Sequence, residues 1–336
     1  MLLIDALYIN NSGGFRLLNF LTTTLVHRDI SFFLLADSRC RGRLDYCEKI
    51  EYMKASMKNR CRFYHNHRFD FSLVFCFGNM PVPVKMQVPV YTYFHNINLL
   101  TLSEAHSKKA LLAMWLKRQL FRHFKHNTDY WLVQTLNTAK ELCKHLKENE
   151  NRVMLMPFYE LPEGLTALKN ENHGDAYVYI ANYTGAKGHE ELLEAWRLLH
   201  RQGIDKTLHL TVKKQSPFCI KIEQAQKEGV NVVNHGFVSF EEVIKLYQQS
   251  KAIIYPSHNE SLGLGIIEAI EAGCDVIGAD LPYIHTICQP SLTFNPYDPE
   301  SIAFAVAEYE KGAPQKSALC VENRIEELID LLTSNK

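Results

Sequence analysis

Residues 252–280 read as a strand, a turn, a helix and a second strand. The apolar run that ends near Tyr255 predicts a buried strand, and a turn with two glycines follows it. A helix closed by Gly273 then leads to a second strand at Asp275–Ile277. This order is typical of a parallel α/β sheet, in which the turn after a strand's carboxyl end binds ligands. The free N–H groups at the start of the helix favour an anion there.

Two carboxylates flank this turn. Glu260 precedes it, and Glu268 stands on the first turns of the helix. A carboxylate accepts hydrogen bonds from ligand hydroxyls, while a phosphate suits backbone N–H groups. Together these groups predict a sugar-nucleotide site. The alternative is an ordinary strand-to-helix turn whose glutamates lie on the surface.

The stretch from Glu260 to Glu268, Glu-Ser-Leu-Gly-Leu-Gly-Ile-Ile-Glu, resembles the E-x7-E signature of the retaining GT-B glycosyltransferases of family four, also called glycosyl transferases group 1. The resemblance implies an α/β chain of GT-B fold, with two Rossmann-like domains facing across a cleft. It also implies transfer of a sugar from a nucleoside diphosphate sugar with retention of configuration. Glu260 would position donor-sugar hydroxyls and Glu268 the ribose, and the donor would also contact Ser261, Leu262, Gly263 and Leu264.

Length and composition fit a soluble globular protein. The 336 residues suit two domains, and 46% apolar residues with a formal net charge of zero exclude a bulk nucleic-acid binder. Nine cysteines without a C-x2-C pair indicate reduced thiols in the cytosol. Met1 leads directly into a strand-like run, and no apolar run reaches the roughly 18 residues of a membrane span. We therefore expect a cytoplasmic protein whose membrane contact, if any, is peripheral.

Apolar runs alternate with helical patterns along the whole chain, which indicates βαβ units. The strands expected in the first half are Leu2–Ile9, Phe32–Ala36, Leu73–Phe77, Val88–Phe94, Asp129–Val133 and Val153–Met156. Helices are expected near residues 46–57 and from Gln134–Thr135 to Leu146. Periodicity is lost between Tyr159 and Gly174, which predicts a linker. The expected domains are residues 1–160, which would bind the acceptor, and 161–317, which would bind the donor. In GT-B folds the last helix crosses back, so residues 318–336 would pack on the first domain.

The second half repeats this alternation of strands and helices, and the turns between them are clearer. The expected strands are Ala176–Ile180, Leu208–Val212, Val230–Val233 and Leu292–Phe294, and the expected helices are 189–200, 220–228, 241–249, 299–310 and 322–332. These units, with residues 252–280 between them, predict a second parallel sheet.

Two features of the first half point to ligand contacts. Gly13 and Gly14 follow the first strand at a helix start, where glycines let a backbone approach a ligand, although a purely structural turn explains them equally well. His95 comes just after the strand that ends at Phe94. It resembles the family's histidine that faces the donor sugar, and we count it among the catalytic residues with Glu260 and Lys187.

The first strand-to-helix turn of the second half spans Ala181–Gly188 and resembles the family's G-R-L-x-x-x-K-G loop, whose Arg and Lys hold the donor diphosphate. Lys187 matches the family's lysine. Asn182 stands at the Arg position, so a bidentate cation is replaced by a neutral amide. Either Lys213 or Lys214, after the next strand, could supply the missing charge.

The sequence says less about which nucleobase binds and whether a metal is needed. Phe237 and Val238 stand in a turn that looks like the family's loop whose backbone holds the base, so its side chains do not identify the base. UDP is favoured over GDP. His65 with His67, and His123 with His126, lack the further ligands of a metal site, and a D-x-D motif is absent. We expect a metal-independent enzyme without a cofactor.

Residues 107–126 hold the only dense basic cluster of the sequence. On a helical wheel, an apolar stripe is expected to pack inward: Leu112, Leu116, Leu120 and Phe124. The opposite side collects Lys108, Leu111, Trp115, Arg118, Arg122 and Lys125. Such a face suits an anionic membrane surface. The alternative is a solvated charged face with Trp115 covered by a neighbouring element.

These observations predict a glycosyltransferase that acts on a saccharide acceptor, lipid-linked and at the inner face of the cytoplasmic membrane. The expected role is the synthesis of a bacterial surface polysaccharide of the O-antigen or capsule type. Two alternatives stay open. One is a GT-B sugar-nucleotide epimerase, and the other is an inactive sugar-nucleotide-binding subunit, because Asn182 breaks the diphosphate loop.

Overall fold

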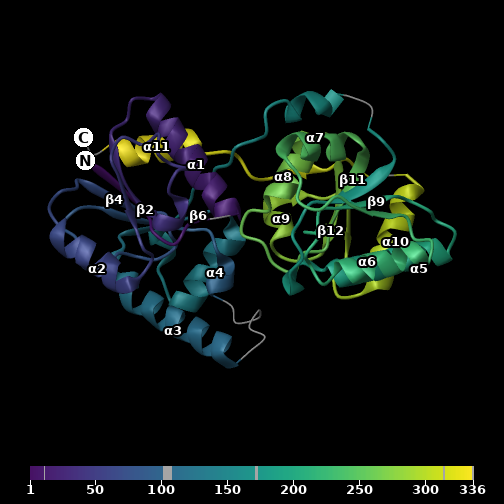
Figure 1. Cartoon of the computed structure of the whole chain (residues 1–336), viewed down its shortest axis with the longest axis horizontal. Coiled ribbons are helices and arrows are strands. Elements are labelled where there is room, and N and C mark those ends of the chain that lie inside the picture. Colours follow the sequence, from purple (N-terminus) through teal and green to yellow (C-terminus); the bar gives the residue numbers. More distant parts are fainter. Residues whose placement is uncertain (11, 101–107, 171–172, 313–314, 335–336) are drawn as a thin grey trace. The chain divides into compact units, whose positions relative to one another are not determined.

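The computed structural model describes residues 1–10, 12–100, 108–170, 173–312 and 315–334. The chain divides into two compact units (Figure 1). Unit 1 comprises Met1–Glu160 with Glu322–Lys336, and unit 2 comprises Leu161–Val321. Each unit is an α/β domain built on its own parallel sheet, which confirms the expected fold class.

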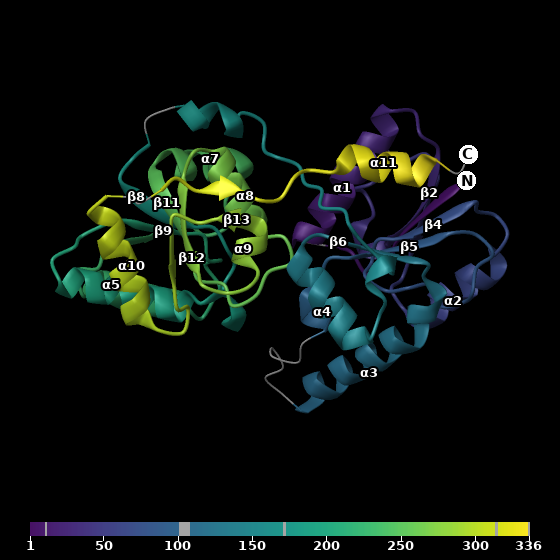
Figure 2. The ribbon, with the colours of Figure 1, turned by 180° about the vertical axis from the view of Figure 1, so that it is seen from behind.

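The sheet of unit 1 has seven strands in the order β3-β2-β1-β4-β5-β6-β7, all parallel. The strands are β1 Leu2–Ala6, β2 Phe32–Asp37, β3 Ile50–Met53, β4 Leu73–Cys76, β5 Val90–Phe94, β6 Tyr130–Val133 and β7 Val153–Leu155. Helices α1 (Ser12–His27) and α11 (Ile325–Thr333) lie on one side of the sheet (Figures 1 and 2). The other side carries α2 Met57–Asn66, α3 Lys108–Phe124 and α4 Leu136–Leu146.

Two sequence predictions for unit 1 are wrong. The first strand ends at Ala6 rather than Ile9, because the Leu7 N–H turns back to donate to Asp5 Oδ1 (3.1 Å) and Tyr8 has a φ of 110°. The helix expected near 46–57 is instead the strand β3, which pairs with β2 at the edge of the sheet. The helix begins only at Met57, after Ser56 caps it.

A buried ion pair joins β1 to α2. Arg60 Nε donates to Asp5 Oδ2 (2.7 Å), and the Tyr64 hydroxyl donates to the same oxygen (2.8 Å). The Arg60 guanidinium also donates to the carbonyls of Met80 (2.8 Å) and Pro81 (2.6 Å). A buried guanidinium is stabilised only when its charge and donors are matched, so this network fixes the loop after β4.

The sheet of unit 2 has six strands in the order β10-β9-β8-β11-β12-β14, again all parallel. The strands are β8 Ala176–Tyr179, β9 Leu208–Leu210, β10 Val232–Asn234, β11 Ser250–Tyr255, β12 Asp275–Ala279 and β14 Leu292–Phe294. One face is covered by α5 His189–Arg201, α6 Cys219–Lys227 and α10 Pro299–Glu310, and the other by α7 Phe240–Gln248 and α8 Leu264–Glu271 (Figures 1 and 2).

The strand order of unit 2 defines where a ligand would bind. The chain starts at β8, adds β9 and β10 on one side, and then returns to add β11, β12 and β14 on the other. The crevice of such a doubly wound sheet lies at the carboxyl ends of the two strands where the order reverses. These strands are β8 and β11.

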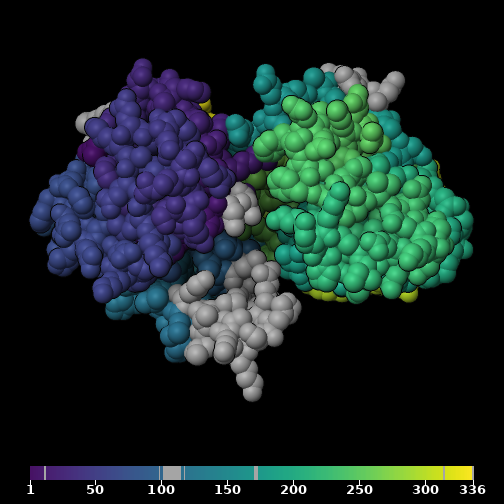
Figure 3. Space-filling model, in the orientation of Figure 1, coloured from purple at the N-terminus to yellow at the C-terminus, as the bar shows by residue number. Residues whose placement is uncertain are grey.

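Figure 3 shows the surface of the chain in the orientation of Figure 1, coloured by residue number. Two short strands, β13 (Cys288–Gln289) and β15 (Ala318–Leu319), pair antiparallel beside the short helix α9 (Ile284–Ile287). Across the described residues, none of the helices is both long enough and apolar enough to cross a membrane.

Candidate active site

The loops after β8 and β11 meet at the point where the strand order of unit 2 reverses. The His258 N–H donates to the carbonyl of Ala186 (2.8 Å), which ties one loop to the other. Gly188 has a φ of 64°, and a Cβ at this position would lie 2.4 Å from the carbonyl oxygen of Pro256. Only glycine therefore allows the backbones to approach this closely.

Lys187 and Glu260 form an ion pair at this junction. Lys187 Nζ contacts Glu260 Oε1, and the two side chains are 27% and 14% exposed. The Tyr255 hydroxyl donates to the same oxygen (3.0 Å), and the Tyr179 hydroxyl donates to the Lys187 carbonyl (2.9 Å). Burial and the charge of Glu260 raise the pKa of Tyr255 well above its ordinary value, so its hydroxyl stays a donor. Both charges are thus held at the carboxyl end of the sheet.

Helix α8 begins beside this pair. Gly263 caps it with a φ of 65°, and the first turn contains no acidic residue, so its N–H groups are not matched by a carboxylate of that turn. The expected donor-contacting residues Ser261 and Leu262 lie in the preceding turn, and Leu264 opens the helix. A phosphate is the kind of group that such a terminus stabilises.

Glu268 lies further along α8 and is buried, with 6% of its surface exposed. The Tyr247 hydroxyl lies 3.4 Å from Glu268 Oε2 and 3.3 Å from the Gly265 carbonyl. The carboxylate is therefore held by the protein, on the helix that starts at the junction.

The other expected donor residues of unit 2 lie on the loops after β8, β9 and β10. Asn182, Lys213 and Lys214 are exposed, as is Phe237 (81%), while Val238 is half-buried.

Sequence reasoning missed Asn234, which organises two of these loops. Its amide accepts from the Val212 N–H (2.9 Å) and donates to the Val212 carbonyl (2.9 Å), while its oxygen also lies 3.3 Å from the Gly236 nitrogen. Lys214 lies along this loop, since a Cβ at Gly236 would be 3.4 Å from Lys214 Cγ. An Asn at the end of a short strand was the only available signal.

A second group of predicted residues comes together within unit 1. Gly13 and Gly14 lie in the first turn of α1, and a Cβ at Gly14 would lie 3.2 Å from His95 Cε1. His95 directly follows β5 and stacks on the Phe77 ring, with 5.1 Å between centroids. Burial lowers the pKa of His95 to about 4, so the imidazole is neutral near pH 7.

The inward stripe predicted for the basic helix is wrong. Leu116 and Leu120 are 49% and 38% exposed, and Phe121 is instead the buried side chain (4%). Phe121 faces inward because it packs on Phe94 and Trp131, with ring centroids 5.5 and 5.3 Å apart. The placements of residue 107 and of the Lys108, Leu111 and Leu112 side chains lie outside what the structure describes.

On the remaining surface of α3, Trp115 is 50% exposed and Arg122 is exposed. Arg118 is half-buried, and burial together with the neighbouring charge of Arg122 lowers its pKa. The exposed face therefore combines Trp115, Leu116, Leu120 and Arg122, which we call the α3 face.

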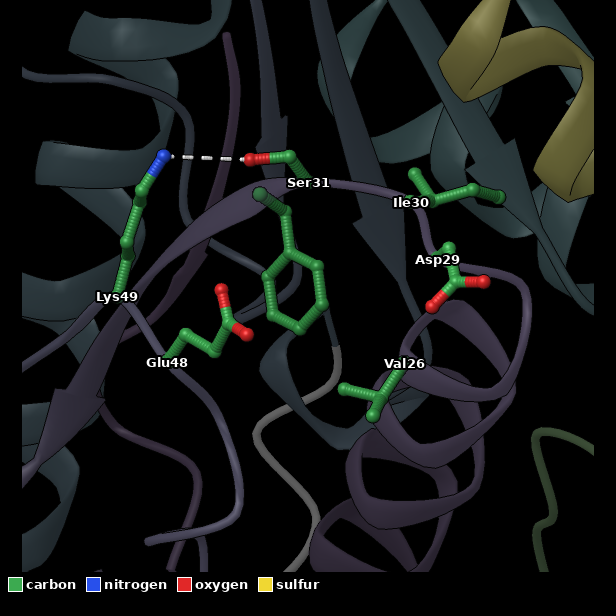
Figure 4. A pocket seen from close by; sticks show the side chains of 7 residues that line it. Val26, Asp29, Ile30, Ser31, Glu48 and Lys49 are labelled. Atoms are coloured by element: carbon green, nitrogen blue, oxygen red, sulfur yellow. Dashed lines mark hydrogen bonds between the residues drawn. The ribbon is translucent and has the colours of Figure 1, made fainter.

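Other parts of the structure gather fewer side chains suited to catalysis or metal binding. Among the described residues, no three His, Cys, Asp or Glu side chains gather as metal ligands would. A hollow of about 180 Å³ lies by the start of β2, at the edge of the sheet opposite to His95, and is lined by Val26, Asp29, Ile30, Ser31, Phe32, Glu48 and Lys49 (Figure 4). Lys49 Nζ donates to Ser31 Oγ across it (3.4 Å).

Known proteins resemble this chain over its second half. Residues 167–326, nearly half of the chain, match the family model described as glycosyl transferases group 1. The serotype-specific mannosyltransferase WbdA of Escherichia coli is 29% identical over 150 residues, which are 42% of this chain and 18% of WbdA. The aligned part thus spans less than a fifth of that relative's length.

Solved structures resemble the whole chain. Sucrose-phosphate synthase from Thermosynechococcus elongatus aligns with a TM-score of 0.69 at 15% identity, covering 93% of this chain and 90% of that chain. WaaG, a glycosyltransferase involved in lipopolysaccharide biosynthesis, aligns with a TM-score of 0.63 at 15% identity, covering 99% and 100%. The chain has the two-domain, Rossmann-like GT-B fold. The family match supports a glycosyltransferase of group 1, and the solved structures show the fold.

Proposed function

We propose that the chain is a retaining glycosyltransferase, which transfers a sugar from a nucleoside diphosphate sugar to a saccharide acceptor during synthesis of a bacterial surface polysaccharide. The observation that carries this proposal is the Lys187–Glu260 pair at the junction of the β8 and β11 loops, beside the start of α8. A cation, a carboxylate and a helix N-terminus together match a diphosphate attached to a sugar.

Donor binding would exchange the partners of this pair. The diphosphate brings negative charge, so Lys187 would turn from Glu260 to a phosphate oxygen. Glu260 would then be free to accept hydrogen bonds from donor-sugar hydroxyls, while the Tyr255 hydroxyl keeps its oxygen in place. In the structure, the two charges satisfy each other at a partly buried position.

The reaction breaks the bond between the sugar and the diphosphate. Negative charge grows on the leaving diphosphate, and a fixed cation with aligned N–H groups stabilises it more in the transition state than in the ground state. Lys187 and the first turn of α8 would supply this stabilisation. His95, neutral near pH 7, would contact the donor sugar without adding a charge.

The donor and acceptor are assigned by chemistry and by likeness. We propose a metal-independent reaction, with UDP as the favoured nucleotide before GDP. The relative WbdA is named a mannosyltransferase, which makes mannose the first sugar to test. WaaG is named for lipopolysaccharide biosynthesis, which supports a lipid-linked saccharide as the acceptor.

The test compares Glu260→Gln with the wild type and with Glu271→Gln, a matched change on α8 whose side chain pairs with Lys169 instead. Calorimetry measures binding of UDP, GDP, ADP and TDP, and NMR follows turnover of the corresponding sugar nucleotides. We expect Glu260→Gln to bind nucleotide as well as the wild type, because Lys187 is released, yet to lose about 100-fold in turnover. Glu271→Gln should behave as the wild type.

Three other outcomes would contradict the proposal. A new sugar-nucleotide epimer without glycosyl transfer would identify an epimerase. Tight binding without any turnover, even with saccharide acceptors, would identify a binding subunit. A product whose anomeric configuration is inverted relative to the donor would exclude retention.

We also propose that the α3 face holds the protein on an anionic membrane surface. Helix α3 contains three Lys and two Arg and no acidic residue, and the face exposes an indole and two leucines beside Arg122. Tryptophan at the headgroup level and cations near anionic lipid are each stabilised there. The support for this proposal is the joint exposure of apolar and basic side chains.

Sedimentation with anionic liposomes tests the α3 face. The wild type should sediment less as salt rises, because screening weakens the attraction. Trp115→Ser with Leu116→Ser and Arg122→Ser should abolish sedimentation, whereas Phe69→Ser, which changes another exposed aromatic side chain (76%), should not. A wild type that stays in the supernatant would overturn the assignment.

A further inference from the structure

Asn79 holds His95 through two contacts. Asn79 lies in the loop after β4 and is 6% exposed. Its Oδ1 accepts a hydrogen bond from the backbone N–H of His95 (2.7 Å), and its Nδ2 lies 3.1 Å from His95 Nε2. One amide therefore contacts both the backbone and the ring of the same residue.

The first contact fixes the orientation of the amide. A backbone N–H can only donate, so the Asn79 atom beside it must be the oxygen. The amide nitrogen then faces the ring, and an NH2 group can only donate. His95 Nε2 must accept in this arrangement, which places the proton of the neutral imidazole on Nδ1.

The carbonyl of Phe77 competes for the same nitrogen. It lies 3.1 Å from His95 Nε2 and would favour a proton there. That tautomer would set two N–H groups against each other and leave a buried Asn79 donor unpaired, which costs about 1–3 kcal/mol. A carbonyl left without a donor is tolerated more readily than a buried N–H group. The Asn79 contact therefore decides the tautomer.

The surroundings keep this geometry rigid. Asn79 has a φ of 66°, a left-handed conformation that Asn adopts more readily than most residues but that is still strained. Arg60 donates to the carbonyls of the next two residues, Met80 and Pro81, and so anchors the loop to the buried ion pair with Asp5. A strained residue in an anchored loop indicates that its side chain is required there.

We propose that Asn79 is a positioning residue that holds His95 in the Nδ1-protonated tautomer, so that the imidazole presents an N–H donor to the donor sugar. The part concerning the sugar rests on the proposed function, whereas the tautomer does not. Among the residues that the structure describes, the hydrogen bonds of the His95 ring all involve Nε2. Nδ1 is thus the nitrogen available to a ligand. A neutral ring, which burial favours here, donates one hydrogen bond without adding charge.

Long-range ¹⁵N–¹H NMR on the full-length chain labelled with ¹⁵N-histidine tests the tautomer directly, with His95→Gln to assign the signals. The wild type should show a protonated Nδ1 and an unprotonated Nε2. Asn79→Asp keeps the acceptor for the His95 backbone N–H but replaces the NH2 donor by an acceptor. It should therefore move the proton to Nε2 and raise the pKa of His95.

Asn79→Gly separates positioning from folding, because glycine adopts the left-handed conformation without strain. Its melting temperature should fall only modestly, because relief of the backbone strain offsets part of the loss of the acceptor for the His95 N–H, while the two tautomers of His95 should become mixed. Asp29→Gly, which replaces another left-handed residue (φ 54°) in unit 1, should leave the His95 signals unchanged. In a transfer assay, Asn79→Gly should lower turnover about 10-fold, the effect of losing one oriented hydrogen bond.

The readouts distinguish two kinds of failure. A wild type with the proton on Nε2, or an Asn79→Gly variant with an unchanged tautomer, would overturn the role of Asn79 whatever the enzyme does. If the tautomer shifts as expected but the wild type transfers no sugar, the assignment of Asn79 stands and the proposed function fails.

Discussion

Replacing Lys187 by alanine tests the charge on which the proposed reaction depends. The Lys187 side chain is 27% exposed and pairs with a Glu260 side chain that is 14% exposed, so water screens this position only in part. At an effective dielectric constant of about 20, two unit charges about 4 Å apart interact by roughly 4 kcal/mol. The first turn of α8 would retain part of the stabilisation of the diphosphate. We therefore expect a loss of about 2.7–4 kcal/mol in the transition state, or 100- to 1,000-fold in turnover.

Steady-state kinetics with a sugar nucleotide and a saccharide acceptor measure this loss. Because the charge on the diphosphate grows as the bond breaks, kcat should fall more than the donor KM rises. Lys187→Arg keeps the charge and should retain part of the activity. The melting temperature of Lys187→Ala should fall modestly, since Glu260 keeps the Tyr255 hydroxyl as a donor.

The matched control is the double variant Lys213→Ala with Lys214→Ala, which removes the two exposed cations after β9. It should lose less activity than Lys187→Ala. If the double variant is inactive and Lys187→Ala is active, the diphosphate is held by the next loop. The proposed role of Lys187 would then be refuted.

Glu268→Ala should weaken nucleoside diphosphate binding by about 1–3 kcal/mol, because α8 loses the buried carboxylate expected to hold the ribose; an unchanged calorimetric Kd would contradict this. Burial lowers the pKa of His189 from 6.5 to about 4, so only the unfolded chain takes up the proton between these values. The free energy of unfolding should therefore fall as the pH falls from about 6.5 to 4, and denaturant titrations of His189→Gln should show a shallower fall; equal slopes would refute the assignment. Gly188→Ala should lower the free energy of unfolding by more than about 1 kcal/mol, because a Cβ there meets the Pro256 carbonyl oxygen at 2.4 Å. Gly203→Ala, also at positive φ but with open space around its Cβ, should cost less in the same titration.

Most strands and helices could be read from the sequence because their signals are local. Alternating apolar runs and helical patterns depend on neighbouring residues, so β11, α8 and β12 were predicted from residues 252–280. One failure has a tertiary cause. The helix expected near 46–57 proved to be an edge strand, because pairing with β2 outweighs a weak helical pattern.

The candidate site was predicted as a set of residues but not as a set of contacts. Lys187 and Glu260 were each chosen by motif, yet they stand 73 positions apart, and only the parallel order of β8 and β11 brings them together. Tyr255 was visible at the end of a strand, but the sequence does not show that its hydroxyl meets Glu260. Asn79 left no signal beyond a turn after β4.

The sequence by itself therefore determined the α/β class, the strand-to-helix turns and the residue types that suit a sugar nucleotide. Only the tertiary structure decided which side chains meet. Asp5 pairs with Arg60, Asn79 contacts His95, and Phe121 rather than Leu116 packs inward. The physical reason is that local conformation follows from adjacent residues, whereas a contact between distant residues depends on strand order, register and the packing of helices on the sheet.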